Sequence, residues 1–155
     1  MALPGRATDE DTQDLQRLEV SPYGFALSAG DPGKLNGVRS GRLRVQDAGS
    51  QLVAMALAEA KPIVQGEQWL DMCAGPGGKA ALLAAFAERS GAALVANEVS
   101  PHRAKLVSES LSNSGFEVKV SVQDGRTLHG SYDRILIDAP CTGLGALRRR
   151  PEARW

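Results

Sequence analysis

The chain has 155 residues, with 18 Lys and Arg side chains balanced by 18 Asp and Glu. This length predicts about one domain, which is large enough to fold without disulfides or a structural metal. The balanced charge points to no class of partner, and a hydrophobic content of 43% excludes wholesale disorder. The longest apolar run (80–87) is too short to cross a bilayer, no signal peptide is visible, and two cysteines with two separate histidines form no zinc pattern. We expect a cytoplasmic monomer with no metal and no membrane partner.

The first part of the chain carries weak structural signals. Residues 1–18 are polar and acidic without an apolar period, which predicts a mobile lead. Two short strands are expected at 23–27 and 43–45, separated by turn residues at 29–33. We interpret residues 1–40 as a small, irregular, partly disordered N-terminal piece and residues 41–155 as the main domain.

The main domain has a clearer pattern. Asp47 is expected to begin a helix that ends near Lys61, because the residue before a proline avoids helical geometry. Its inward side should carry Ala48, Leu52 and Met55. Further helices are expected at 79–89 and between Ser100 and Gly115, alternating with strands at 69–72, 92–96, 118–122 and 132–137. This order predicts an α/β fold with an open, mostly parallel sheet and right-handed crossovers.

An acidic residue ends or follows each of the four predicted strands: Asp71, Glu98, Asp124 and Asp138. Acids also gather at such places because they cap helices and favour the positive end of the helix dipole. Ligands of open α/β sheets, however, bind beyond the carboxyl ends of the strands, where all four would lie. Four acids along one sheet edge therefore predict a ligand site.

A glycine-rich loop joins the first of these strands to its helix and consists of Cys73, Ala74, Gly75, Pro76, Gly77, Gly78 and Lys79. Its glycines permit close approach of a ligand to the backbone, and the helix start offers free N–H groups. The spacing does not fit a Walker loop. Gly75, Gly77 and Ala80 fit a dinucleotide loop, which leaves an NAD(P)-dependent oxidoreductase as an alternative. An adenosine ligand that carries an amino acid uses the four acids more naturally, with Asp71 near the amino acid, Glu98 at the ribose and Asp124 at the adenine.

A second informative segment follows the last predicted strand, where Asp138 leads through alanine and proline to Cys141. A thiol there suits reversible addition to a ring carbon, while a small buried thiol is the plain structural alternative. For Cys73 the structural interpretation is stronger. The basic residues Arg148, Arg149, Arg150 and Arg154 suit phosphate contacts or simply a solvated basic end, so a non-catalytic RNA-binding fragment is a further alternative.

Together these segments resemble the Sun family of RNA (cytosine-5) methyltransferases, specifically the bacterial small-subunit ribosomal RNA methyltransferase B type. The likeness lies mainly in residues 71–79 and 138–145, and extends to Val45-Gln46-Asp47, Ser50-Gln51 and residues 150–155. The resemblance implies a Rossmann-like, S-adenosylmethionine-dependent fold that methylates carbon 5 of a flipped-out cytosine in RNA. It also makes residues 1–40 the remnant of an upstream RNA-binding subdomain.

The resemblance assigns roles to particular residues. Residues 73–79 would hold the methionine end of the cofactor, Glu98 the ribose and Asp124 the adenine, while Asp138 would line the site between cofactor and base. Cys141 corresponds to the cysteine that assists product release. The family's covalent nucleophile is a later cysteine in a Thr-Cys motif, and this chain stops at Trp155 before it. We therefore expect an incomplete core of about four parallel strands that binds cofactor weakly, does not turn over and leaves the Ile135 strand as an exposed apolar edge.

Overall fold

The computed structural model describes residues 1–140, so Cys141 and the predicted RNA-binding arginines Arg148, Arg149, Arg150 and Arg154 lie outside the described residues. Four strands form a fully parallel sheet in the order β5-β4-β3-β6. Their bounds are β3 Gln68–Asp71, β4 Ala93–Asn97, β5 Lys119–Ser121 and β6 Arg134–Leu136. Asp71 is in register with Ala96 and Leu136 on its two neighbours, so the carboxyl ends of the strands share one edge. The predicted parallel α/β sheet is confirmed.

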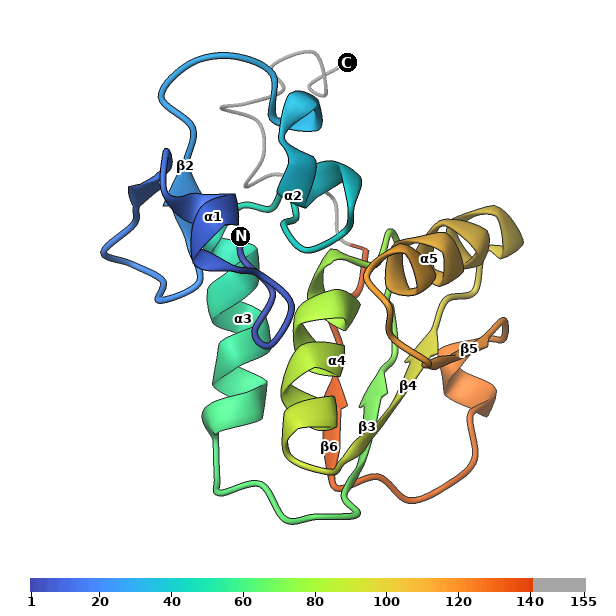
Figure 1. Cartoon of the computed structure of the whole chain (residues 1–155). Helices are drawn as coiled ribbons and strands as arrows, with labels where there is room; N and C mark the ends of the chain where they lie inside the picture. The colour runs from blue at the N-terminus through green and yellow to red at the C-terminus, as the bar shows by residue number, and fades with distance from the viewer. Residues whose placement is uncertain (141–155) are drawn as a thin grey trace.

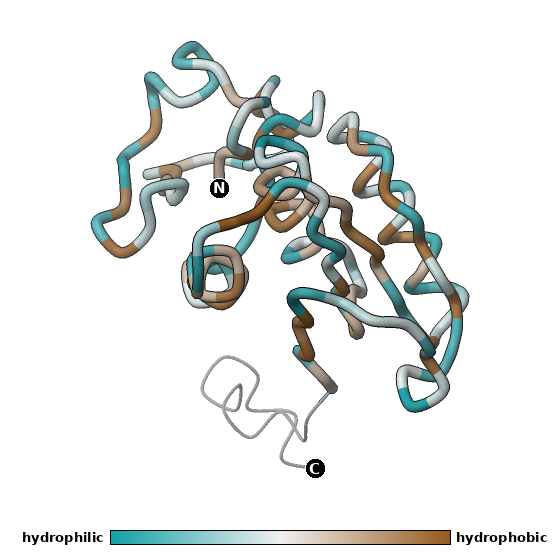
Figure 2. The backbone as a smooth tube through the Cα atoms, turned by 90° about the horizontal axis from the view of Figure 1, so that it is seen from below, coloured by the Kyte–Doolittle hydropathy of each residue, from teal (hydrophilic) through white to brown (hydrophobic). Residues whose placement is uncertain are grey.

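Three helices accompany the sheet: α3 Ala48–Glu59, α4 Gly78–Arg89 and α5 Pro101–Asn113. Helix α4 connects β3 to β4 and α5 connects β4 to β5, and both cross the same face of the sheet (Figure 1). Figure 2 shows this layering from below, with hydrophobic stretches in both helices and strands. The short 3-10 turn η2, Gly125–Thr127, lies between β5 and β6.

Helix α4 is the centre of the core. Its residues 80–87, the longest apolar run of the sequence, are all buried because the helix contacts α3, α5 and β4 together. Leu82, Leu83 and Phe86 are buried as predicted. On α5 the predicted inner stripe of Ala104, Val107 and Leu111 is also confirmed.

Helix α3 confirms only part of the predicted inward face, because Met55 is buried as expected but Leu52 is not. Leu52 is 43% exposed, whereas Gln51, Ala54, Met55 and Ala58 are buried. The reason is the partner: α3 packs on the alanine-rich α4, and small side chains let two helices approach closely. Apolar spacing alone favoured the larger Leu52 and missed the small residues.

The expectation of a mobile lead at residues 1–18 is wrong, because Met1 and Leu3 are 6% and 1% exposed and belong to the main core. The predicted strand at 43–45 is reduced to an isolated bridge between Leu43 and Ala2. Two buried side chains give no periodic signal, which explains the error.

The elements of this part are α1 Asp9–Thr12, β1 Gln16–Arg17, β2 Phe25–Ala26, η1 Pro32–Lys34 and α2 Asn36–Arg39, with β1 and β2 antiparallel.

Two arginines join this N-terminal part to the end of α5. Arg6 Nε donates to the carbonyl of Ser114 at 3.1 Å, and Arg44 Nη1 donates to that of Ser110 at 3.1 Å. Cations at a helix C-terminus satisfy its free carbonyls and its dipole. Gly41, with φ +73°, allows the close approach, since a Cβ there would lie 2.1 Å from the Asn113 carbonyl oxygen. These contacts fix the chain just before α3, next to the glycine-rich loop.

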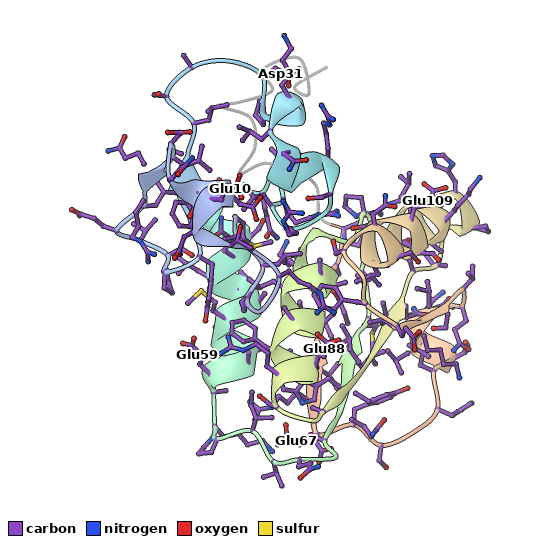
Figure 3. The ribbon with its side chains drawn as sticks, viewed as in Figure 1. Glu10, Asp31, Glu59, Glu67, Glu88 and Glu109 are labelled. Atoms are coloured by element: carbon purple, nitrogen blue, oxygen red, sulfur yellow. The ribbon has the colours of Figure 1, made fainter. Side chains whose placement is uncertain are left out.

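The amino ends of the strands, at the far end of the sheet from the glycine-rich loop, hold a buried ion pair. Arg134 Nε donates to Glu67 Oε2 at 2.7 Å, and the same guanidinium donates to carbonyls of Leu57 and Ala58 at the end of α3. Trp69 Nε1 also donates to Glu67 Oε2 at 2.7 Å. Figure 3 shows Glu67 at the amino ends of the strands. This network is structural, because it ties α3 to β3 and β6 at the edge remote from the glycine-rich loop.

Strand β6 is one of the two outer strands of the described sheet, and Ile135 on it is 43% exposed. The predicted apolar edge is therefore present within residues 1–140. An exposed apolar edge strand favours association with other chains. None of the helices in the described part has the length and apolar character needed to span a bilayer.

Candidate functional site

A pocket of about 170 Å³ lies at the carboxyl edge of the sheet, between the start of α3, the glycine-rich loop and the end of β6. Most of the predicted cofactor-binding residues line it. The lining residues are Val45, Gln46, Ser50, Asp71, Cys73, Ala74, Gly75, Pro76, Gly78, Lys79 and Asp138. The structure therefore brings the end of β3, with Asp71, next to the end of β6, with Asp138, as the sequence predicted.

The glycine-rich loop adopts a shape in which two of its glycines leave no room or no allowed conformation for a side chain. Gly77 has φ +107°, a left-handed conformation that L side chains rarely adopt, and it precedes the first residue of α4. A Cβ on Gly75 would lie 2.3 Å from Glu98 Oε2. The Ala74 amide donates to the Asn97 carbonyl at 2.8 Å, which anchors the loop to β4. The loop is thus held against the neighbouring strand end.

Asp71 is the most unusual group in the pocket. Asp71 is 1% exposed, and neither carboxylate oxygen has a hydrogen bond of good geometry among the described residues, although the Cys73 amide is close enough to lower its pKa. Burial raises the pKa of Asp71 to about 7, and the nearby Asp138 and Glu98 add to this shift, while Lys79 and the Cys73 amide oppose it. A buried carboxylate without partners is costly, so it indicates a place for a cationic donor from a ligand.

Lys79 and Asp138 form an ion pair at the pocket. Lys79 Nζ lies 2.6 Å from Asp138 Oδ2 and donates to Ser50 Oγ at 3.3 Å. The Asp138 side chain is 51% exposed, so water screens this pair and its contribution to stability is small. Lys79, in the first turn of α4, places a cation beside free helix N–H groups, an arrangement that attracts a carboxylate or phosphate.

Glu98 lies behind the loop and does not line the pocket. Its Oε2 accepts from the Gly75 amide at 3.1 Å, and its Oε1 accepts from the Ser100 amide at 3.0 Å. Arg103, which sequence reasoning missed, lies 3.5 Å from Glu98 Oε2 and donates to the Gly75 carbonyl at 2.5 Å. Glu98 and Arg103 together clamp Gly75. No motif pointed to Arg103, although it lies in the first turn of α5, where it reaches the Gly75 carbonyl.

Asp124 lies at the same sheet edge but outside the pocket. It accepts from the Arg126 amide at 2.9 Å and forms an ion pair with the Arg126 guanidinium, which lowers the pKa of Asp124 to about 2. The edge itself is held by Asn97, whose Nδ2 donates to the carbonyls of Met72 at 3.1 Å and Gln123 at 3.0 Å. Asn97 thereby joins the ends of β3 and β5 and places Asp124 near the loop.

Of the two cysteines, only Cys73 lies within the described residues. Burial and the surrounding acids Asp71, Glu98 and Asp138 raise the pKa of the Cys73 thiol, so it is a poor nucleophile and fits the structural interpretation. Cys141 lies outside the described residues. Within residues 1–140 there is also no cluster of three side chains suited to a metal ion.

A larger hollow of about 380 Å³ lies between the end of α4, the start of β4 and the α5–β5 connection. Its lining includes Glu88, Phe116 and Glu117, but no buried polar group within it lacks a partner among the described residues. Size alone therefore does not mark the site, and the smaller pocket at the strand ends carries the chemistry.

Comparison with known proteins agrees with this geometry. Residues 58–155 match the family model described as 16S rRNA methyltransferase RsmB/F. The chain belongs to the RsmB/F family. The match covers more than half of the chain and includes both segments on which the resemblance to the Sun family rested.

Individual members of the RsmB/F family show the same relationship. The chain is 54% identical over 137 residues to Rv1407 of Mycobacterium tuberculosis, which carries a provisional methyltransferase name; the match covers 87% of this chain and 30% of that protein. It is 37% identical to ribosomal RNA small subunit methyltransferase B of Erwinia tasmaniensis, covering 86% of this chain and 32% of that protein. The chain thus spans about a third of the length of these curated relatives.

A solved structure supports the fold. The crystal structure of NSun6 from Pyrococcus horikoshii with SFG superposes with a TM-score of 0.65 at 28% identity, covering 75% of this chain and 30% of that one. The expected Rossmann-like methyltransferase fold is therefore confirmed for the RsmB/F chain described here.

Proposed function

We propose that the pocket binds the amino-acid end of S-adenosylmethionine and that the protein to which this chain belongs transfers a methyl group to carbon 5 of cytosine in RNA, with ribosomal RNA as the substrate class. The observation that carries the proposal is Asp71, a buried carboxylate with two unpartnered oxygens inside a pocket built by a glycine-rich loop. The ammonium of a bound amino acid supplies the hydrogen bonds that Asp71 lacks.

Size and charge fit this ligand. Whole ligand pockets span about 300 Å³ or more, so a pocket of about 170 Å³ suits only the amino-acid end. Lys79 and the first turn of α4 would hold the carboxylate. The acids Asp71, Glu98 and Asp138 outnumber the cations Lys79 and Arg103 here, which favours a cofactor whose sulfonium gives it net positive charge.

The adenosine would extend along the sheet edge toward Glu98 and Asp124, as the resemblance implies. Each carboxylate oxygen can accept more than one hydrogen bond, so Glu98 can bind ribose hydroxyls while it still holds the Gly75 and Ser100 amides. Asp124 would accept from the adenine amino group. Both assignments are part of the proposal.

The alternative of a dinucleotide-dependent oxidoreductase meets an electrostatic objection. The Gly75, Gly77 and Ala80 spacing fits a dinucleotide loop, but a pyrophosphate there would lie close to Asp71 and Asp138. Like charges in a buried site repel strongly. A cationic ligand satisfies the same carboxylates.

For the transfer step, the cofactor supplies an electrophilic methyl group when bound. Asp138 lines the pocket, and following the resemblance it would lie between the cofactor and the target base and orient the base. Following the resemblance, Cys141 would assist product release, and Arg148, Arg149, Arg150 and Arg154 would contact RNA phosphates. We propose a cytoplasmic location for this activity, since ribosomal RNA is its substrate class.

Calorimetric titration of the 155-residue chain tests the ligand assignment. We expect S-adenosylmethionine to bind and NADH not to bind, and the pair Asp71→Asn plus Lys79→Met to abolish the heat of binding. Glu109→Gln, an exposed change on α5 (Figure 3), is the matched control and should bind as the parent does. Binding of NADH alone would favour the oxidoreductase, and RNA affinity that ignores cofactor would favour an RNA-binding fragment.

A further inference from the structure

Asp71 is not the only unsatisfied acceptor at the pocket. Gln46 Oε1 is also buried without a hydrogen-bond partner among the described residues, and Gln46 lines the same pocket. It comes from the segment before α3, on the side of the pocket formed by Val45 and Ser50. Two acceptor groups from different parts of the chain therefore lack donors in one small space.

The backbone of Gln46 is held by a buried relay of two side chains. Gln51 Nε2 donates to the Gln46 carbonyl at 3.2 Å, and Ser21 Oγ donates to Gln51 Oε1 at 2.7 Å. Ser21 and Gln51 are 0% and 1% exposed. A Cβ on Gly78 would lie 3.2 Å from Gln46 Nε2, so the amide rests against the first residue of α4. The relay thus holds the Gln46 backbone beside the pocket, and the side-chain amide packs against the first residue of α4.

We propose that Gln46 is a specificity residue that accepts a hydrogen bond from the ligand ammonium, sharing it with Asp71. This inference rests on the proposed function and names how the site selects its ligand. An ammonium has three donors and no acceptor, so it satisfies both groups at once. A ligand with a hydroxyl or a hydrogen at that position leaves at least one buried acceptor unpaired, and such loss gives strong discrimination.

The test compares two ligands that differ only in the amine: S-adenosylhomocysteine and its desamino analogue. Both are titrated calorimetrically into the full chain one pH unit above the Asp71 pKa of about 7, where that carboxylate is ionised. We expect the parent to prefer the amine-bearing ligand. Gln46→Leu should weaken that ligand about ten-fold, the effect of one hydrogen bond to a charged group, and leave the desamino analogue unchanged.

A second variant separates acceptance from donation. Gln46→Glu keeps the acceptor oxygen, so it should retain the preference for the amine. If Gln46→Glu weakens S-adenosylhomocysteine as much as Gln46→Leu does, Gln46 donates to the carboxylate and the inference is overturned. Equal weakening of both ligands by Gln46→Leu, or no change, also overturns it. If the parent binds neither ligand, the proposed function itself fails. Thermal unfolding of each variant checks that the fold is intact.

Discussion

Replacing Asp71 by Asn removes a buried charge without changing the size of the side chain. In the folded chain the pKa of Asp71 is raised from 3.8 to about 7, so the folded state disfavours the ionised form. The cost is absent at acidic pH, where Asp71 is protonated in both states. It grows as the pH rises from the unfolded pKa to the folded pKa, and is complete above about 7.

A difference of about three pKa units corresponds to about 4 kcal/mol at 1.36 kcal/mol per unit. We therefore expect Asp71→Asn to raise the free energy of unfolding by up to about 4 kcal/mol above neutral pH, and to change it little near pH 4. Urea unfolding of parent and variant across this pH range measures the effect. Asp133→Asn, at the opposite end of the sheet, is a comparison at a carboxylate that does accept a hydrogen bond. An Asp71→Asn effect that is destabilising or independent of pH would refute the reasoning.

Three further substitutions test a ligand contact, the packing of the glycine-rich loop and the buried ion pair at the amino ends of the strands. Lys79→Met removes the cation beside the start of α4, so we expect about ten-fold weaker S-adenosylmethionine binding in calorimetry; unchanged affinity would contradict the carboxylate assignment. Gly75→Ala forces a Cβ to 2.3 Å from Glu98 Oε2 and should cost about 1–3 kcal/mol in urea unfolding, whereas a neutral result would mean the loop is not clamped. Arg134→Met leaves the buried Glu67 without its arginine partner, so we expect a loss of about 3–5 kcal/mol, and a stable variant would contradict the buried pair.

The position of the site followed from the sequence because parallel strands bring their ends to one edge. Asp71, Asp138 and the loop between Cys73 and Lys79 meet at the pocket for that reason. The order of strands and helices was enough to predict this, since right-handed crossovers leave few arrangements of such a sheet.

The state of each acid did not follow from the sequence. Asp71 is unpartnered, Glu98 holds the loop, and Asp124 is paired with Arg126. The Asp124 pairing lies only two residues away and was visible in principle. The surroundings of Asp71 and Glu98 depend on which side chains the loop and α5 bring close, and spacing along the sequence does not specify this.

The N-terminal part was the least predictable. Met1 and Leu3 enter the core without any periodic pattern, and Arg6 and Arg44 reach across to the end of α5. Gln46 belongs to a segment of the family resemblance, but whether its side-chain oxygen is paired depends on which groups surround it in the fold. Contacts between distant segments decide such features, and no local rule contains them.

The most direct test of the ligand site is the mapping of amide chemical shifts in the isotope-labelled chain during titration with S-adenosylhomocysteine. We expect the largest changes at Gly75, Gly78 and Lys79, with little change at Arg134 on the opposite edge of the sheet. Changes confined to the hollow around Phe116, or no saturable change, would contradict the assignment of the pocket.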